Sequence, residues 1–184
     1  MLYGMVKLQG PRRVALLGDS LTGGPGYAAG LEPLLTNRSV VKAYSYPGKG
    51  SAFIRNRVFD VFTWAPTDIV VLAGVNDLAA GRPASDVIEN LQNVYTEARA
   101  HGVRVVAVLL TPWSGHFRGA SCSADTDAVN RWIQYQARDV DAVVRTDDLG
   151  DSSSRLKSWY DSGDGLHLNA EGQEMLARLV SKAF

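Results

Sequence analysis

Residues 14–22 read VALLGDSLT, where four apolar residues are followed at once by Gly18, Asp19 and Ser20. A short apolar run that stops at a glycine is typical of a buried strand that meets a turn. In α/β folds, the site residues gather at the carboxyl ends of the strands. This stretch therefore predicts a first buried strand and places Ser20 at the edge of a sheet.

Four further strands are predicted along the chain, with helical sequence between them. They cover residues 40–44, 68–73, 103–110 and 142–144. Strands that alternate with helices at this spacing indicate a three-layer α/β/α sandwich around a parallel sheet. No internal repeat, low-complexity tract or linker divides the sequence, so we expect residues 1–184 to form a single domain.

The helices are predicted from apolar residues that recur at helical spacing. They are expected near 31–35 and across 54–62 and 129–136. The clearest helix begins at Asp86, with Glu89 three residues on, and is stopped by Gly102. A last helix follows Asn169, whose side chain is expected to cap it.

The balance of charge and the cysteine count exclude several partners. Lysine plus arginine number 19 and aspartate plus glutamate also number 19, so no overall field favours nucleic acid or an anionic membrane. Cys122 is the single cysteine, which excludes an internal disulfide and a thiolate cluster for zinc. We therefore expect a small-molecule partner, with no metal and no cofactor.

The first residues carry the expectation about location. Residues 1–13 contain Lys7, Arg12 and Arg13 in a weakly apolar stretch, without a continuous apolar run of signal-peptide length. No stretch of the sequence is long enough to span a bilayer. We therefore expect a cytoplasmic protein without stable membrane insertion.

Four short motifs, in sequence order, carry the candidate chemistry. They are GDSLT at 18–22, PGKG at 47–50, GVND at 74–77 and DGLH at 164–167. Each follows a predicted strand or precedes the last helix, so an α/β fold would bring all four to one edge of the sheet. One such motif arises readily by chance, but four in order at these positions indicate a site.

Together these motifs resemble those of the SGNH (GDSL-type) esterases and acyl hydrolases, from Gly18 to His167. The resemblance implies a flavodoxin-like sheet of about five parallel strands in the order 2-1-3-4-5. It also implies the roles of nucleophile for Ser20, base for His167 and third triad member for Asp164. The oxyanion donors that it implies are Gly48 and Asn76, beside Ser20 itself.

The second motif departs from the family pattern. Many members carry an asparagine shortly before its glycine, whereas residues 45–47 here are Ser-Tyr-Pro. Gly50 therefore stays open as an alternative to Gly48 for the backbone donor.

Chemistry supports the same roles. A serine hydroxyl needs a neutral imidazole within hydrogen-bond reach to take its proton, and His167 is the candidate. Asp164, three residues earlier, fits by its spacing the acid that orients such a ring. The charge that develops on a substrate oxygen needs preorganised donors. The backbone N–H groups of Ser20 and Gly48 and the side-chain amide of Asn76 would supply them.

Further candidates are aromatic residues on loops near the strand ends. Residues 112–123 include Trp113, His116 and Phe117, and Trp159 lies shortly before the fourth motif. Loops in this position often carry specificity, so we weigh substrate contact equally with core packing for these side chains.

His101 and Cys122 have simpler interpretations. His101 is expected to be a helix C-terminal residue, because Gly102 follows it. Cys122 is interpreted as a small loop residue, since no histidine with a matching motif lies beside it.

The favoured function is a serine esterase that hydrolyses carboxylic esters through an acyl-Ser20 intermediate. At 184 residues there is little room for a large lid, so short acyl chains are expected. An O-acetyl ester of a carbohydrate, or acyl transfer to an acceptor other than water, stays open on the same scaffold.

A binding module is the alternative from another class. Residues 18–30 form a Gly-rich loop after the first strand, where flavodoxin-like proteins bind phosphate or a nucleotide. The loop lacks the dinucleotide and P-loop patterns, and this function would leave Asn76, Asp164 and His167 unexplained.

Overall fold

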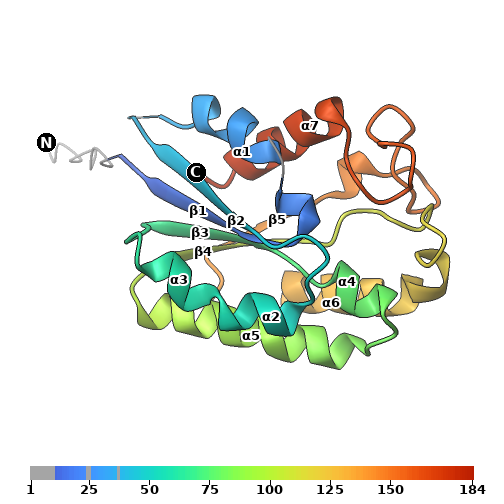
Figure 1. Ribbon diagram of the computed structural model, residues 1–184, viewed down its shortest axis with the longest axis horizontal. Helices are drawn as coiled ribbons and strands as arrows, with labels where there is room; N and C mark the ends of the chain where they lie inside the picture. The colour runs from blue at the N-terminus through green and yellow to red at the C-terminus, as the bar shows by residue number, and fades with distance from the viewer. Residues whose placement is uncertain (1–10, 24–25, 37) are drawn as a thin grey trace, which may run out of the picture.

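Five parallel strands form one sheet in the order β2-β1-β3-β4-β5 (Figure 1). Their bounds are β1 (Arg13–Gly18), β2 (Val40–Ser45), β3 (Asp68–Leu72), β4 (Arg104–Val108) and β5 (Ala142–Val144). This arrangement confirms the predicted α/β fold and its strand order. β1 lies between β2 and β3, with Gly18 opposite Ser45 on one side and Leu72 on the other. The ends of three strands therefore meet beside the GDSLT motif.

This computed structural model describes residues 11–23, 26–36 and 38–184. The expectation of a cytoplasmic protein depended largely on residues 1–10, which lie outside these ranges. Two residues of the Gly-rich stretch, 24 and 25, also lie outside them.

Helices cover both faces of the sheet (Figure 1). On one face lie α1 (Gly26–Leu31) and α7 (Ala170–Ser181). The other face carries α2 (Ser51–Asn56), α3 (Val58–Phe62), α4 (Val75–Ala79), α5 (Ala84–Ala100) and α6 (Ser123–Tyr135). Short 3-10 helices are η1 (Ser20–Thr22), η2 (Glu32–Leu34), η3 (Ala120–Cys122) and η4 (Asp147–Leu149). Covered on both faces, β3 is buried along its whole length, as parallel strands usually are.

The helix predicted near 31–35 is misplaced. The α-helix of this segment is α1, which ends at Leu31, and η2 follows it with Pro33 in its first turn. Proline has no N–H to donate and disfavours an α conformation in the residue before it, which explains the end of the helix. Tyr27 and Leu31, one turn apart, are fully buried.

The helix predicted across 54–62 is two helices. α2 and α3 meet at Arg57, whose N–H bonds to the carbonyl of Ile54 at 3.0 Å, three residues back. The tighter turn keeps Ile54, Val58 and Val61 buried, so the apolar spacing survives the break.

The start of α5 differs from the prediction, while the start of α7 confirms it. α5 begins at Ala84, before Asp86, and the N–H of Ala84 donates to the carboxylate of Asp125 in α6 at 3.3 Å. A tertiary contact therefore takes the place of the expected local cap. At α7, the side chain of Asn169 accepts the N–H of Gly172 at 3.0 Å.

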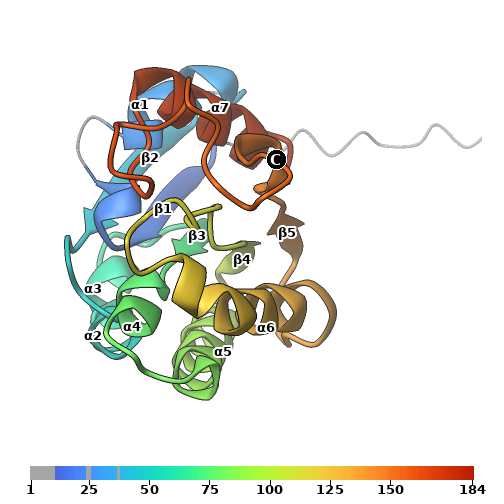
Figure 2. The ribbon, with the colours of Figure 1, turned by 90° about the vertical axis from the view of Figure 1, so that its right-hand side faces the viewer.

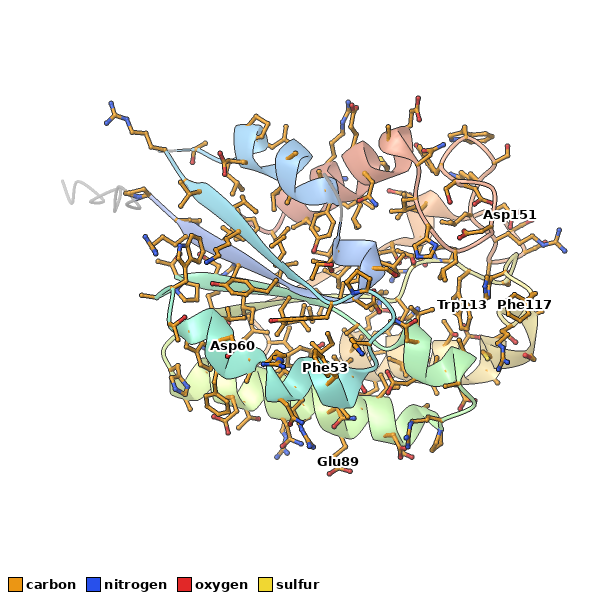
Figure 3. The ribbon with its side chains drawn as sticks, viewed as in Figure 1. Phe53, Asp60, Glu89, Trp113, Phe117 and Asp151 are labelled. Atoms are coloured by element: carbon orange, nitrogen blue, oxygen red, sulfur yellow. The ribbon has the colours of Figure 1, made fainter. Side chains whose placement is uncertain are left out.

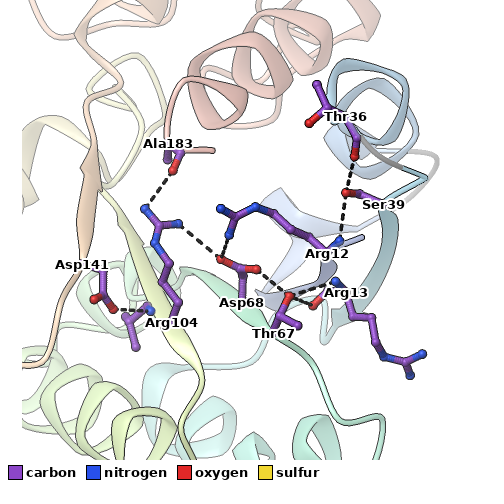
Figure 4. A network of polar contacts seen from close by, with 10 residues as sticks. Arg12, Arg13, Thr36, Ser39, Thr67, Asp68, Arg104, Asp141 and Ala183 are labelled. Carbon is purple, nitrogen blue, oxygen red and sulfur yellow. Dashed lines mark hydrogen bonds and ion pairs between the residues drawn. The ribbon is translucent and has the colours of Figure 1, made fainter. Parts of the chain in front are cut away.

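A buried carboxylate organises the opposite, amino-terminal edge of the sheet (Figure 4). Asp68 is fully buried at the start of β3 and pairs with Arg12 at 2.8 Å and Arg104 at 3.3 Å. Arg104 also donates to the carbonyl of Ala183 at 2.8 Å. This cluster links β1, β3, β4 and the end of the chain. It lies at the amino-terminal ends of the strands, whereas the motifs that follow strands lie at their carboxyl ends.

Candidate active site

Three predicted site residues are joined by hydrogen bonds at the carboxyl edge of the sheet, which Figure 2 shows from in front. Ser20 Oγ lies 2.9 Å from Nε2 of His167, although the two residues are 147 positions apart in sequence. Nδ1 of His167 lies 2.6 Å from a carboxylate oxygen of Asp164. A hydroxyl, an imidazole and a carboxylate in this order can pass a proton from the serine to the ring.

Backbone N–H groups fix Asp164. Its second oxygen accepts the N–H groups of Leu166 at 2.9 Å and His167 at 2.8 Å. Partial burial raises the pKa of Asp164, but the hydrogen bonds from His167 and Leu166 outweigh it and lower the pKa to about 2. Asp164 is therefore a carboxylate at neutral pH.

A second aspartate, Asp161, holds the backbone of the loop before α7 by hydrogen bonds. Asp161 accepts the N–H groups of Gly163 at 2.8 Å and Gly165 at 3.0 Å. Gly165 has a φ of +74°, and a Cβ there would lie 2.4 Å from the carbonyl carbon of Gly115. Because backbone meets backbone at this point, residue 165 must be a glycine.

Ser20 begins η1 directly after β1, at a turn fixed by its neighbour Asp19. One oxygen of Asp19 accepts the N–H of Leu21 at 3.0 Å, and Ser45 Oγ donates to the Asp19 carbonyl at 2.9 Å. The end of β2 is thereby tied to the turn that presents the serine.

Asp19 is also a buried titratable group that our sequence analysis did not single out. Its second carboxylate oxygen is buried and has no hydrogen-bond partner within the described ranges. Burial raises the pKa of Asp19 to about 7, against the lowering effects of the Leu21 N–H and of nearby His167. The sequence does contain one indication of this group, because Asp19 is an acidic residue that closely follows the apolar run 14–17.

The two glycines of the second motif have different surroundings. Gly48 has a φ of +72°, and no atom lies within 4 Å of the place of a Cβ. At Gly50, a Cβ would lie 2.7 Å from the carboxylate of Asp77. The backbone at Gly48 is therefore open on this side, whereas the missing side chain at Gly50 makes room for Asp77.

Asn76 lies in the first turn of α4. Before it, the chain turns at Gly74, whose φ of +130° is in the region that favours glycine. The side-chain amide of Asn76 donates to the carbonyl of Lys49 at 3.2 Å. An amide has two N–H donors, and within residues 11–23, 26–36 and 38–184 the second one has no acceptor. The contact brings the third motif against the second.

The aromatic candidates divide between core and surface (Figure 3). Trp113 is buried, and its indole N–H donates to Thr126 at 3.0 Å. Phe117, on the same loop, is 83% exposed, and its ring lies 4.4 Å from the ring of His116. Trp159 is 60% exposed. Trp113 thus packs as a core residue, while Phe117 and Trp159 are accessible from solvent.

A cavity of about 140 Å³ lies beside Trp113 at the ends of β4 and β5. Its lining includes Leu109, Thr111, Asn130 and Thr146. None of the residues that line it belongs to the hydrogen-bonded line of Ser20, His167 and Asp164.

His101 and Cys122 take no part in the hydrogen bonds that join Ser20, His167 and Asp164. His101 ends α5, as predicted, and its ring stacks on that of Phe62 at 4.1 Å. The thiol of Cys122 donates to the carbonyl of Leu78 at 3.2 Å.

The part of the chain that the structure describes holds no group of three or more His, Cys, Asp or Glu side chains arranged to bind a metal ion. Within the same ranges, every helix is too short or too polar to cross a membrane.

The chain is similar to one known family. A sequence model of the GDSL-like lipase/acylhydrolase family matches residues 16–175. None of the curated proteins compared with the chain matches it.

Solved structures share the fold at low sequence identity. A GDSL-like lipase from Bacteroides thetaiotaomicron VPI-5482 has a TM-score of 0.78 and 21% identity, over 94% of this chain and 87% of that one. The esterase EstA from Pseudoalteromonas, inhibited by monoethylphosphonate, has a TM-score of 0.72 and 17% identity, over 94% and 96%. An acetyl esterase mutant with an acetate ion has a TM-score of 0.69 and 20% identity, over 93% and 95%.

Proposed function

The chain belongs to the GDSL-like lipase/acylhydrolase family, and on that premise we propose that it is a serine esterase acting through an acyl-Ser20 intermediate. The observation that carries the proposal is the continuous hydrogen-bonded line from Ser20 through His167 to Asp164. Such a line is the means by which a weakly acidic hydroxyl becomes a nucleophile.

Acylation begins when Ser20 Oγ bonds to the carbonyl carbon of the ester while Nε2 of His167 takes the hydroxyl proton. The carbonyl electron pair moves to oxygen. Collapse of this intermediate breaks the bond to the alcohol oxygen, which takes the proton back from His167. Asp164, ionised at neutral pH, stabilises the positive ring between these steps.

Deacylation repeats these steps with water. Nε2 of His167 takes a proton from the water as its oxygen bonds to the acyl carbon. The bond to Ser20 Oγ then breaks, the serine regains its proton, and a carboxylic acid leaves. An acceptor alcohol in place of water would give acyl transfer from the same intermediate.

The oxyanion would be held by the backbone N–H groups of Ser20 and Gly48 and by the free N–H of the Asn76 amide. The open backbone at Gly48 supports its choice over Gly50, which lies against Asp77. Donors preorganised in this way are worth about 3 kcal/mol each in the transition state.

Esters with short acyl chains are the proposed substrates. The similarity in fold to an acetyl esterase fits this proposal.

The test is labelling with a fluorophosphonate probe, followed by peptide mass mapping. We expect Ser20 to be modified in the wild type and the label to be lost in Ser20→Ala. Ser39→Ala is the matched control, because Ser39 is a buried serine at the opposite edge of the sheet, where its hydroxyl bonds to the Thr36 carbonyl and the Arg12 N–H. It should still label at Ser20. Folded wild-type protein that takes no label would refute the proposal and favour a binding module.

A further inference from the structure

Two consecutive residues of α4 hold the segment that follows Gly48. Asn76 donates to the carbonyl of Lys49 at 3.2 Å. The carboxylate of Asp77 accepts the backbone N–H of Ser51 at 2.6 Å and the Ser51 hydroxyl at 3.1 Å. Two successive residues of α4, which follows β3, are therefore bonded to the segment that follows β2.

A third helix secures this link. Asn90 of α5 donates from its side-chain amide to Ser51 Oγ at 3.0 Å. Asp77, Ser51 and Asn90 are all buried. A buried carboxylate is costly unless hydrogen bonds satisfy it, so this cluster is held in one arrangement. In Figure 1, α2, α4 and α5 lie on the same face of the sheet.

The sequence makes room for the link at Gly50. A side chain there would run into the Asp77 carboxylate, at 2.7 Å from its nearer oxygen. The PGKG motif thus contains one glycine that opens the backbone and one that lets Asp77 reach Ser51.

We propose that Asp77 is a positioning residue that, through Ser51, fixes the distance between the Gly48 N–H and the Asn76 amide. This inference rests on the proposed function, in which these two groups are oxyanion donors. They come from different loops, so no local hydrogen bond within one loop sets their separation. Electrostatic stabilisation depends on donors that are in place before charge develops. A displacement of about 1 Å can cost about a hundredfold in rate.

A purely structural role would predict something different. It would lower the melting temperature and leave the turnover of the folded protein unchanged. A positioning role lowers kcat and leaves KM unchanged, because the donors act on the oxyanion more than on the bound ester.

The experiment compares Ser51→Ala and Asp77→Asn with the wild type. Ser51→Ala removes the hydroxyl and keeps the backbone N–H that Asp77 accepts. Its matched control is Ser39→Ala. Ser39 is also a buried serine, and its hydroxyl accepts the Arg12 N–H at 3.0 Å and donates to the Thr36 carbonyl at 2.6 Å. Ser39 lies at the opposite edge of the sheet.

Three quantities are measured: kcat and KM for a p-nitrophenyl ester, the melting temperature, and hydrogen–deuterium exchange of the peptide spanning 46–56. We expect Ser51→Ala and Asp77→Asn to lower kcat about tenfold or more, with KM unchanged and faster exchange at 49–51. Ser39→Ala should leave kcat and the exchange of this peptide unchanged.

An unchanged kcat, a rise in KM alone, or unchanged exchange at 49–51 in Ser51→Ala would overturn the inference. If Asp77→Asn does not fold, Ser51→Ala decides the result. Failure of the proposed function is separately visible, because the wild type itself would then take no fluorophosphonate label. A wild type that labels at Ser20, with variants that keep full turnover, refutes the positioning role alone.

Discussion

Asp164 holds both the ring and the backbone of His167: one carboxylate oxygen lies 2.6 Å from Nδ1, and the other accepts the His167 N–H at 2.8 Å. Because Asp164 bonds to His167 at two points, it fixes the orientation of the ring toward Ser20. It also favours the tautomer that carries a proton on Nδ1. Both bonds require the carboxylate, and Asp164 is ionised across the neutral pH range.

We expect Asp164→Ala to lower kcat, but less than His167→Ala does. Without Asp164 the imidazole can still accept a proton, whereas without His167 the hydroxyl has no base at hydrogen-bond distance. Steady-state rates of ester hydrolysis at pH 7 measure both. Equal losses in two folded variants would show that Asp164 does more than orient the ring.

Replacing Asn76 by alanine should lower kcat by about a hundredfold or more, since an oxyanion donor is lost. KM should change little. The variant also loses the bond to the Lys49 carbonyl, so hydrogen exchange of 46–56 should be recorded beside the kinetics. A kcat equal to that of the wild type would remove Asn76 from the oxyanion hole.

On the proposed preference for short acyl chains, a series of p-nitrophenyl esters should show the highest kcat/KM at two to four carbons. Longer chains should be slower. Assays are run below the micelle-forming concentration of each ester. A maximum at ten carbons or more would contradict the preference.

The buried carboxyl of Asp19 should make stability fall as pH rises. Its pKa is raised from the ordinary 3.8 of an aspartate to about 7 in the folded protein, so between these pH values the folded state binds more protons than the unfolded state. The free energy of unfolding therefore decreases from about pH 4 to about pH 7, on the order of a few kcal/mol from this group.

Asp19→Asn cannot titrate and serves as the comparison. Urea unfolding at several pH values should show the stability of the wild type falling relative to Asp19→Asn across this window. A constant difference between the two proteins would show that Asp19 has the same pKa folded and unfolded.

Asp68→Asn should reduce stability without changing kcat. The change removes one charge from the cluster with Arg12 and Arg104, at the edge of the sheet opposite Ser20. Both arginines are partly exposed, so we expect a loss of about 2 kcal/mol, less than for a fully buried pair. Chemical denaturation and the rate of ester hydrolysis test the two halves of this prediction. A large fall in kcat would mean that the two edges are coupled.

The strands could be predicted because the apolar runs are short and end at glycine or a polar turn, whereas their order in the sheet was implied only by the resemblance to the SGNH hydrolases. Helix ends could be predicted where the cap is local, as at Asn169, but not where another segment decides them. At α5 the N–H of Ala84 is satisfied by Asp125, 41 residues away, rather than by Asp86 in its own first turn. At 31–35 the apolar spacing suggested a helix, but Pro33 ends it.

The candidate site shows the same limit. The motifs pointed to Ser20, Asp164 and His167, and in the structure hydrogen bonds join these three side chains. Their catalytic roles stay predictions. Nothing local in the sequence pairs Asp77 with Ser51, because that bond exists only once the loops after β2 and β3 lie side by side. The raised pKa of Asp19 likewise comes from burial, which a motif does not reveal.

The close approach of the two loops at Gly165 and Gly115 has a consequence for protein engineering. A Cβ at Gly119 would lie 1.8 Å from the carbonyl oxygen of Trp113, so backbone contact also constrains the path of residues 113–119. A mutant library aimed at altered substrate choice should therefore keep Gly119 and Gly165 and vary Phe117, which is exposed on the same loop. The library would then vary a position at which a substitution disturbs folding least, because its side chain is exposed.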